Sequence, residues 1–261
     1  MTGTLKTRTE GAIGWLVFSN PERDNAVTYE MWRDMPRAIH EFDSNPAVRV
    51  IAVTGAGDKA FVAGADISEF EHLRGSPEAS AEYNHATRAG QDALLNTSTP
   101  TVAVIRGICF GGGIGLALSC DMRIAADDAR FCVPAARLGL GYAYAGIKRL
   151  IEVVGPASTA EIFSTARRYD AAEALRMGLV NHVLPTAGLD AFVAEYLGQI
   201  ADNAPLTVAA AMRAIDEALK PERERDLLAV EDMVERCFAS EDYKEGRTAF
   251  MEKRKPAFKG R

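Results

Sequence analysis

Hydrophobic runs alternate with amphipathic stretches through the first two thirds of the chain. Several runs are rich in β-branched residues and end in Gly or Pro, which is typical of buried strands. These strand-like runs are 11–21, 48–57, 101–105, and the segments MRIAA and ARFCV that follow Asp121. After Thr28, a potential N-cap, apolar residues recur at a spacing of three and four, from Met31 to Phe42, which predicts a helix. Strands that alternate with helices predict a layered α/β fold.

The last third of the chain shows helical periodicity instead. Asp170 and Glu173 have capping-box spacing, and Gly178 suits the end of that short helix. Apolar stripes predict further helices over 189–200, after Pro205, and over 227–237. We expect the tail to be helical to about Lys255, where Pro256 stops it.

Three consecutive glycines stand out in CFGGGIGLALSCD, residues 109–121. They lie between an apolar strand and an apolar helix, where backbone N–H groups are unpaired and the helix end is positive. Without Cβ atoms a ligand oxygen can come close, although a tight turn with close packing explains the glycines equally well. A dinucleotide fingerprint would need glycine at position 116, which is Leu116, and no P-loop motif is present.

A second turn of the same kind lies in GDKAFVAGADISEF, residues 57–70. It also follows a strong strand and leads into acidic sequence that we expect to be helical. Two such turns, each after a core strand, can direct two N–H groups at one point. That arrangement is what an oxyanion hole requires.

Composition and charge narrow the class of protein. The 261 residues are 48% hydrophobic with a net charge of −6, which does not favour binding to nucleic acid or anionic membranes. The four cysteines show no CxxC spacing, so we expect free, mostly buried thiols rather than a metal or disulfide set. No apolar run reaches the length of a signal peptide or a membrane span, and we expect a cytoplasmic protein.

Five segments together resemble the crotonase (enoyl-CoA hydratase/isomerase) superfamily. They are NPERDNAVTYEMW, VRVIAVTGAGDKAFVAGADI, PTVAVIRGICFGGGIGLALSCDMRIAADDARF, DAAEALRMGLVNHVL and SEDYKEGRTAFMEKRKPAFK. The resemblance implies an α/β spiral of ββα units over 1–200 that binds an acyl-CoA thioester. It also implies a C-terminal helical region over 201–261 that forms homotrimers, often paired into hexamers, and no metal or redox cofactor.

The resemblance also assigns site residues. The backbone N–H groups of Ala65 and Gly112 match the family's oxyanion donors, which hold the thioester oxygen as it becomes an enolate. The remaining matches concern the binding of coenzyme A. The backbone around Ala63, Asp66 and Ile67 matches the segment that binds the adenine, and Gly111 lies beside the oxyanion turn. Arg23 and Lys253 match positions near the phosphates. Lys253 would act from a neighbouring subunit. For both basic residues, a solvated surface charge is the alternative.

The chain departs from the family's hydratases at two positions. Where they carry the two glutamates that handle water, this sequence has Gly115 and Ala135. Neither can transfer a proton, and such groups typically contribute about 10²–10⁴-fold each. Tyr142 matches a tyrosine of the family's methylmalonyl-CoA decarboxylases, although those enzymes keep a glutamate at the position of Gly115. Pocket-wall packing is the alternative for Tyr142 and the favoured role for Tyr144.

Other polar residues near the predicted acyl pocket are weaker candidates. His85, with Glu82 and Tyr83, lies on a predicted helix that borders the pocket in the family; it is a possible base, but we favour a solvent-facing role. Glu71 and His72 receive the same interpretation.

Three functions stay open at this point. The first is an enoyl-CoA hydratase/isomerase-type enzyme that stabilises a thioester enolate, with true hydration doubtful. The second is a decarboxylase of a malonyl-type CoA thioester, and the third is a non-catalytic acyl-CoA-binding subunit. A serine-peptidase function is excluded because no GxSxG motif is present.

Overall fold

Two stacked sheets form the body of the protein in the computed structural model, which describes residues 3–70 and 75–261. The larger sheet has the order β1-β2-β3-β5-β7-β10 and is parallel except for the β1–β2 hairpin; the smaller has the order β4-β6-β8-β9. The strands are β1 (Thr4–Glu10), β2 (Ile13–Ser19), β3 (Val50–Gly55), β4 (Ala60–Val62), β5 (Thr101–Ile105), β6 (Ile108–Phe110), β7 (Met122–Ala126), β8 (Arg130–Cys132), β9 (Tyr169–Asp170) and β10 (His182–Leu184).

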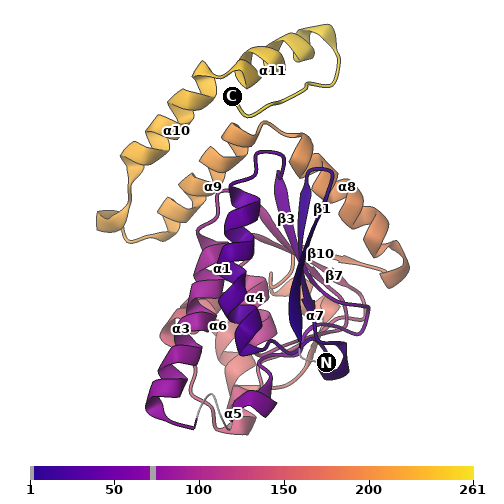
Figure 1. Ribbon diagram of the computed structural model, residues 1–261, viewed down its shortest axis with the longest axis vertical. Coiled ribbons are helices and arrows are strands. Elements are labelled where there is room, and N and C mark those ends of the chain that lie inside the picture. The colour runs from indigo at the N-terminus through magenta and orange to yellow at the C-terminus, as the bar shows by residue number, and fades with distance from the viewer. Residues whose placement is uncertain (1–2, 71–74) are drawn as a thin grey trace.

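Consecutive strands alternate between the two sheets. β3, β5 and β7 enter the larger sheet, and each is followed directly by a strand of the smaller one, β4, β6 or β8. A helix follows each pair before the next turn of the chain begins (Figure 1). The structure therefore confirms the predicted α/β spiral of ββα units.

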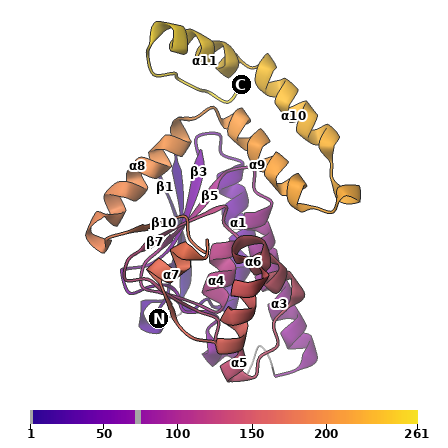
Figure 2. The same ribbon diagram turned by 180° about the vertical axis from the view of Figure 1, so that it is seen from behind.

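Helices cover both faces of the larger sheet. They are α1 (Tyr29–Asp43), α3 (Pro77–Leu95), α4 (Gly112–Leu118), α5 (Ala135–Leu138), α6 (Tyr144–Thr165), α7 (Ala171–Arg176), α8 (Leu189–Asp202), α9 (Pro205–Leu219), α10 (Leu227–Ala239) and α11 (Glu241–Glu252). Figures 1 and 2 show α8 on one face and α1 on the other, and the side chains of β3 divide accordingly. Val50 and Ala52 pack with α8, whereas Ile51 and Val53 join the core beneath α1. Burial on both faces explains why this strand is continuously apolar in sequence.

Helix ends agree with the sequence predictions at several places. The hydroxyl of Thr28 accepts a hydrogen bond from the N–H of Met31 and caps α1. Asp170 and Glu173 form the predicted capping box at the start of α7. Gly178 follows that helix with a positive φ of 78°, as the stop requires.

At the ends of the chain, the sequence analysis missed one strand and misplaced the end of one helix. β1 was not predicted, because its sequence TLKTRTE is polar and most of its residues are exposed at the edge of the sheet. The last helix ends at Glu252 rather than near Lys255, because Lys253 adopts a left-handed conformation with φ of 53°. Three cysteines are buried and Cys237 is partly buried, and all four are free, as predicted.

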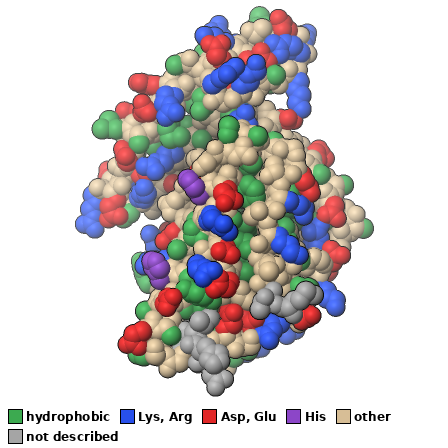
Figure 3. All heavy atoms as spheres, viewed as in Figure 1, with side chains coloured by type: hydrophobic (Ala, Val, Ile, Leu, Met, Phe, Trp, Pro, Cys, Tyr) green, Lys and Arg blue, Asp and Glu red, His purple; other side chains and the backbone are tan. Residues whose placement is uncertain are grey.

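The C-terminal helices extend away from the body (Figures 1 and 2). Several large apolar side chains on them are exposed, among them Leu228 and Phe250 at about four fifths. Hydrophobic and charged side chains are interspersed over this region in Figure 3. The division at residue 200 and the trimer-forming role of 201–261 stay predictions.

Candidate active site

The two glycine-containing turns lie against each other. A Cβ atom built on Gly112 would lie 3.5 Å from the backbone nitrogen of Ala65, and one built on Gly64 would lie 3.7 Å from the nitrogen of Gly112. Because N and Cβ of one residue are about 2.5 Å apart, the Ala65 and Gly112 nitrogens are within roughly 6 Å of each other. The structure thus brings together the two segments that the sequence predicted to converge.

A parallel bridge to Val27 orients the Ala65 amide. The N–H of Val27 donates to the carbonyl of Gly64 at 2.8 Å, and the N–H of Asp66 donates to the carbonyl of Val27 at 2.9 Å. In such a bridge the polar groups of the middle residue point to the opposite side. The Ala65 N–H therefore faces away from Val27, and it has no acceptor within the described part of the chain.

The N–H of Gly112 is unpaired among the described residues because Gly112 lies at the start of α4. Gly111 has φ of 50° and ψ of −112°, a conformation that suits glycine, and its N–H donates to the carbonyl of Cys132 at 2.8 Å. Gly112 is the first residue of the helix, so its N–H has no partner within the helix. No other acceptor for it occurs among residues 3–70 and 75–261.

The positions that lack glutamates border these turns. Gly115 is on α4 one turn beyond Gly112, and Ala135 is buried at the start of α5. A Cβ atom on Gly115 would lie 2.9 Å from the side-chain nitrogen of Gln91, on α3. The Gln91 carboxamide thus occupies the space beside Gly115. The sequence analysis missed Gln91, because a lone glutamine in a helical pattern carries no signal of its position relative to α4.

Tyr142 lies in the loop before α6, half-buried against the main core. Its ring meets Phe163 edge-on, with centroids 4.9 Å apart. Burial, with a smaller contribution from the Cys109 thiol, raises the pKa of Tyr142, so the phenol is neutral at physiological pH. Tyr144 is 79% exposed, so the wall-packing role favoured for Tyr144 is not seen within the single chain.

The candidates on α3 divide between its two sides. His85 is exposed, in keeping with the favoured solvent-facing role, and Glu82 accepts a hydrogen bond from the Tyr29 hydroxyl at 2.8 Å. Tyr83 is buried and stacks edge-on with Phe70, with centroids 6.0 Å apart. Glu71 and His72 lie outside the described residues.

The segment assigned to the CoA adenine adjoins the Ala65 turn. Arg23 forms an ion pair with the buried Asp66 at 2.6 Å and also contacts the hydroxyl of Ser68. Burial raises the pKa of Asp66, but hydrogen bonds from Ser68 and Arg23 outweigh it and hold that pKa below its ordinary value. The N–H of Ala63 donates to the backbone carbonyl of Asp24 at 3.0 Å, whereas Ile67 is 73% exposed. Arg23, Ala63, Asp66 and Ile67 are therefore close together, beside the turn.

Lys253 is not part of this group within one chain. It follows the end of α11, which Figures 1 and 2 place far from α4, beyond α9. A contribution of Lys253 from a neighbouring subunit stays a prediction.

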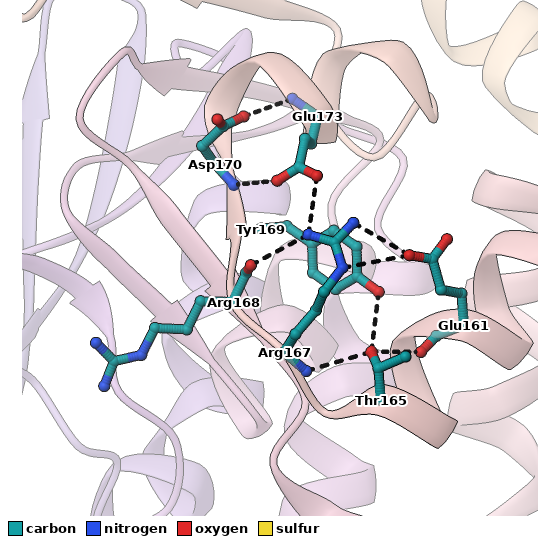
Figure 4. A network of polar contacts seen from close by, with 7 residues as sticks. All are labelled: Glu161, Thr165, Arg167, Arg168, Tyr169, Asp170 and Glu173. Atoms are coloured by element: carbon teal, nitrogen blue, oxygen red, sulfur yellow. Dashed lines mark hydrogen bonds and ion pairs between the residues drawn. The ribbon is translucent and has the colours of Figure 1, made fainter.

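An arginine-centred network fixes the far end of α6 (Figure 4). Arg167 forms ion pairs with Glu161 at 3.1 Å and Glu173 at 2.8 Å, and its guanidinium lies 3.8 Å from the ring centre of Tyr169. Arg168 lies over the ring of Phe110, the residue before the glycine turn. The network thereby ties α6, which follows Tyr142, to α7 and the smaller sheet.

Other features of the described chain do not add to the site. A cavity of about 600 Å³ lies over the middle of β1 and β2 and the end of β3, where Arg106 forms ion pairs with Asp58 and Asp190. None of the predicted site residues lines it. Within residues 3–70 and 75–261, no three His, Cys, Asp or Glu side chains are grouped to hold a metal ion. No helix in that part of the chain has both the length and the apolar character needed to cross a membrane.

A family profile decides the assignment of the chain. The profile described as Enoyl-CoA hydratase/isomerase matches residues 8–261. The chain belongs to this family, within the crotonase superfamily. Its acyl-CoA chemistry and its fold therefore agree with what the sequence motifs predicted.

Individual members of the family are similar over nearly their whole length. A crotonyl-CoA hydratase from Syntrophomonas wolfei is 34% identical, covering 95% of each chain, and a carnitinyl-CoA dehydratase from Proteus mirabilis is 35% identical, covering 100% of each. A solved structure described as an enoyl-CoA hydratase/carnithine racemase from Magnetospirillum magneticum superimposes with a TM-score of 0.94 at 35% identity, covering 98% of this chain and 96% of that one.

Proposed function

We propose that this protein stabilises the enolate of an acyl-CoA thioester between the N–H groups of Ala65 and Gly112. The observation that carries the proposal is the convergence of two backbone amides, from separate turns, that have no acceptor among the described residues. Removing one such donor from a hydrolase costs about 3–4 kcal/mol of transition-state stabilisation. A pair of donors can therefore supply much of the rate acceleration.

The CoA portion would bind along the segment beside Ala65. The backbone at Ala63, Asp66 and Ile67 would receive the adenine, and Gly111 would border the thioester. Arg23, which forms an ion pair with Asp66 and is half-exposed, would meet a phosphate of CoA. Lys253 would add a second positive charge from a neighbouring subunit. Coenzyme A enters as part of the substrate, and the proposal needs no other cofactor.

Decarboxylation of a malonyl-type CoA thioester is the reaction that the side chains support best. Hydration needs groups that move protons to and from water, whereas Gly115 and Ala135 have none to offer. In decarboxylation the electrons of the broken C–C bond pass into the enolate as CO2 leaves, and solvent then supplies one proton to the α-carbon. The neutral Tyr142 hydroxyl can donate a hydrogen bond that orients the departing carboxylate.

Product analysis tests whether the protein turns over an acyl-CoA thioester and whether the reaction is decarboxylation. The purified protein is incubated with crotonyl-CoA, malonyl-CoA and methylmalonyl-CoA, and the products are identified by mass spectrometry. We expect loss of CO2 from one of the malonyl-type thioesters and little or no hydration of crotonyl-CoA. Water addition as the main reaction would restore the hydratase function, and binding without turnover of any thioester would favour the non-catalytic subunit.

We also propose that residues 201–261 assemble the chain into a homotrimer or a dimer of trimers. The exposed apolar side chains of α10 and α11 support this, because a monomer rarely leaves so many large apolar groups in water. Light scattering of the purified protein measures the mass directly. A mass of one or two chains would contradict the proposal.

A further inference from the structure

We propose that the Gln91 carboxamide is a substrate-binding group that selects acyl groups carrying a carboxylate on the α-carbon. The inference rests on the proposed function, since it assumes that the thioester oxygen lies between Ala65 and Gly112. It adds to the site a side chain of α3 that the sequence analysis did not consider.

The position of Gln91 follows from the geometry of α4. Gly112 and Gly115 are three residues apart, so both lie on one face of the helix. The side-chain nitrogen of Gln91 lies 2.9 Å from the Cβ position of Gly115; among the described residues, and apart from the backbone of α4, no other atom lies within 4 Å of that position. A substrate carbonyl held at Gly112 would therefore place its α-carbon near the Gln91 amide, one helical turn along.

The Gln91 amide is available to a ligand. It is half-buried and has no hydrogen-bond partner within the described ranges of the chain. One turn earlier on α3, the hydroxyl of Thr87 is buried and also without a partner there. Residues four apart lie on the same side of a helix, so Thr87 and Gln91 form one polar stripe. Buried polar groups are usually paired, and a ligand that supplies the partner would be preferred over one that does not.

Close packing holds this stripe in place. Gly90, next to Gln91, allows α3 to approach α1: a Cβ atom there would lie 3.1 Å from the Met35 sulfur and 3.1 Å from the Trp32 ring. An amide carried on a fixed helix loses little freedom when it binds, which favours selective recognition.

The chemistry of the amide points to a carboxylate rather than to an activated water. A carboxamide donates hydrogen bonds but does not accept a proton near neutral pH. Like the neutral hydroxyl of Tyr142, it would favour an anionic acyl substituent without repelling it. A glutamate at position 115 would require the Gln91 side chain to turn away, because its Cβ atom would lie 2.9 Å from the amide nitrogen.

The test compares two thioesters with the same number of acyl carbons, methylmalonyl-CoA and butyryl-CoA. The variant Gln91→Met keeps the length of the side chain and removes its hydrogen bonds. Its dissociation constants for the two thioesters are measured by calorimetry at 4 °C, with short injections, and kcat/KM for methylmalonyl-CoA is measured separately. The control is Gln199→Met, which makes the same change at an exposed position of α8.

We expect Gln91→Met to bind methylmalonyl-CoA at least 10-fold more weakly, butyryl-CoA less than 3-fold more weakly, and Gln199→Met to match the wild type. An unchanged preference between the two thioesters, or equal weakening of both, overturns the role of Gln91. Failure of the proposed function has a different signature: the wild type then turns over no thioester. A loss of preference in Gln91→Met supports this inference even in that case, because binding is measured independently of turnover.

Discussion

The backbone half and the side-chain half of the candidate site follow different rules. In the turns at Ala65 and Gly112, the groups that we propose to face the substrate are main-chain amides, and their direction comes from a bridge and a helix start. At Gly115, Ala135 and Gln91, which we call the wall of the candidate site, we propose that single side chains decide the chemistry. A substitution can remove a carboxylate from the wall and leave the fold intact, whereas the amides are inseparable from the fold. The first half therefore indicates the family, and the second half indicates the reaction.

The largest effect should come from deleting one amide of the backbone half. Proline is well tolerated at the first position of a helix, which Gly112 occupies, and the lost N–H has no partner among the residues that the structure describes. Gly112→Pro should fold, yet lose turnover by about 10²–10³-fold or more. Circular dichroism checks the fold, and a kcat measurement checks the chemistry.

Glu241→Pro provides the matched control, because it places proline at the first position of the exposed helix α11. It should keep normal turnover. Full activity in Gly112→Pro would show that the amide of Gly112 does not hold the developing charge.

A second experiment introduces the two glutamates that the side-chain half lacks. The triple variant Gly115→Glu, Ala135→Glu and Gln91→Ala restores both carboxylates and clears the space that Gln91 fills. Hydration of crotonyl-CoA should rise by about 10²-fold, the lower end of what one acid–base group supplies. The reference is Gln91→Ala alone, measured by loss of absorbance of the enoyl thioester. If the folded triple variant hydrates crotonyl-CoA no faster than Gln91→Ala, the loss of hydration is not explained by these three positions alone.

Tyr142→Phe gives a smaller and more selective effect. If the hydroxyl orients a carboxylate, kcat for the malonyl-type substrate should fall about 10-fold, a typical loss for one hydrogen bond of about 1.4 kcal/mol. Binding of butyryl-CoA should not change. Tyr144→Phe removes the same hydroxyl from an exposed ring two residues later and should have no effect. Equal rates in both variants would leave Tyr142 with a packing role.

The smallest effect concerns stability: it tests the hydrogen bonds that hold the end of α3, the helix that carries Gln91, against α1. One oxygen of Asp43, at the end of α1, accepts hydrogen bonds from Thr97, Ser98 and Thr99, directly after α3. Partial burial raises the pKa of Asp43, but the hydrogen bonds outweigh it and hold the pKa below its ordinary value. Asp43→Asn should lower the free energy of unfolding at pH 7 by about 1–2 kcal/mol, since it removes charge from these bonds.

The pH dependence gives the sign of the Asp43 effect. The carboxylate stabilises the fold fully above its unfolded-state pKa of about 4, and this contribution disappears as the pH falls through the lower folded-state value. Urea unfolding between pH 7 and pH 3 should therefore show a difference between wild type and Asp43→Asn that shrinks with acidification. A constant difference over this range would mean that Asp43 acts without its charge.

The sequence predicts the backbone half better than the wall, for a physical reason. Strands buried on both faces and glycine turns leave local patterns, so Gly112 and its neighbours could be placed at a strand-to-helix turn without a structure. The contact between Gln91 and Gly115 joins positions 24 residues apart and depends on how α3 packs, which no local pattern records. β1 escaped prediction for a similar reason: its strand conformation comes from pairing with β2 rather than from an apolar face of its own.

The bridge between Val27 and Ala65 means that the segment before α1 helps to orient one of the two proposed oxyanion donors. A fragment beginning after Val27 would still contain both glycine turns, Tyr142 and Gln91. It would lack the partner that turns the Ala65 peptide outward, so the amide would be free to rotate and the thioester oxygen would meet one fixed donor instead of two. Splitting or permuting this chain for engineering should therefore spare the connection ahead of α1, although no reacting group lies there.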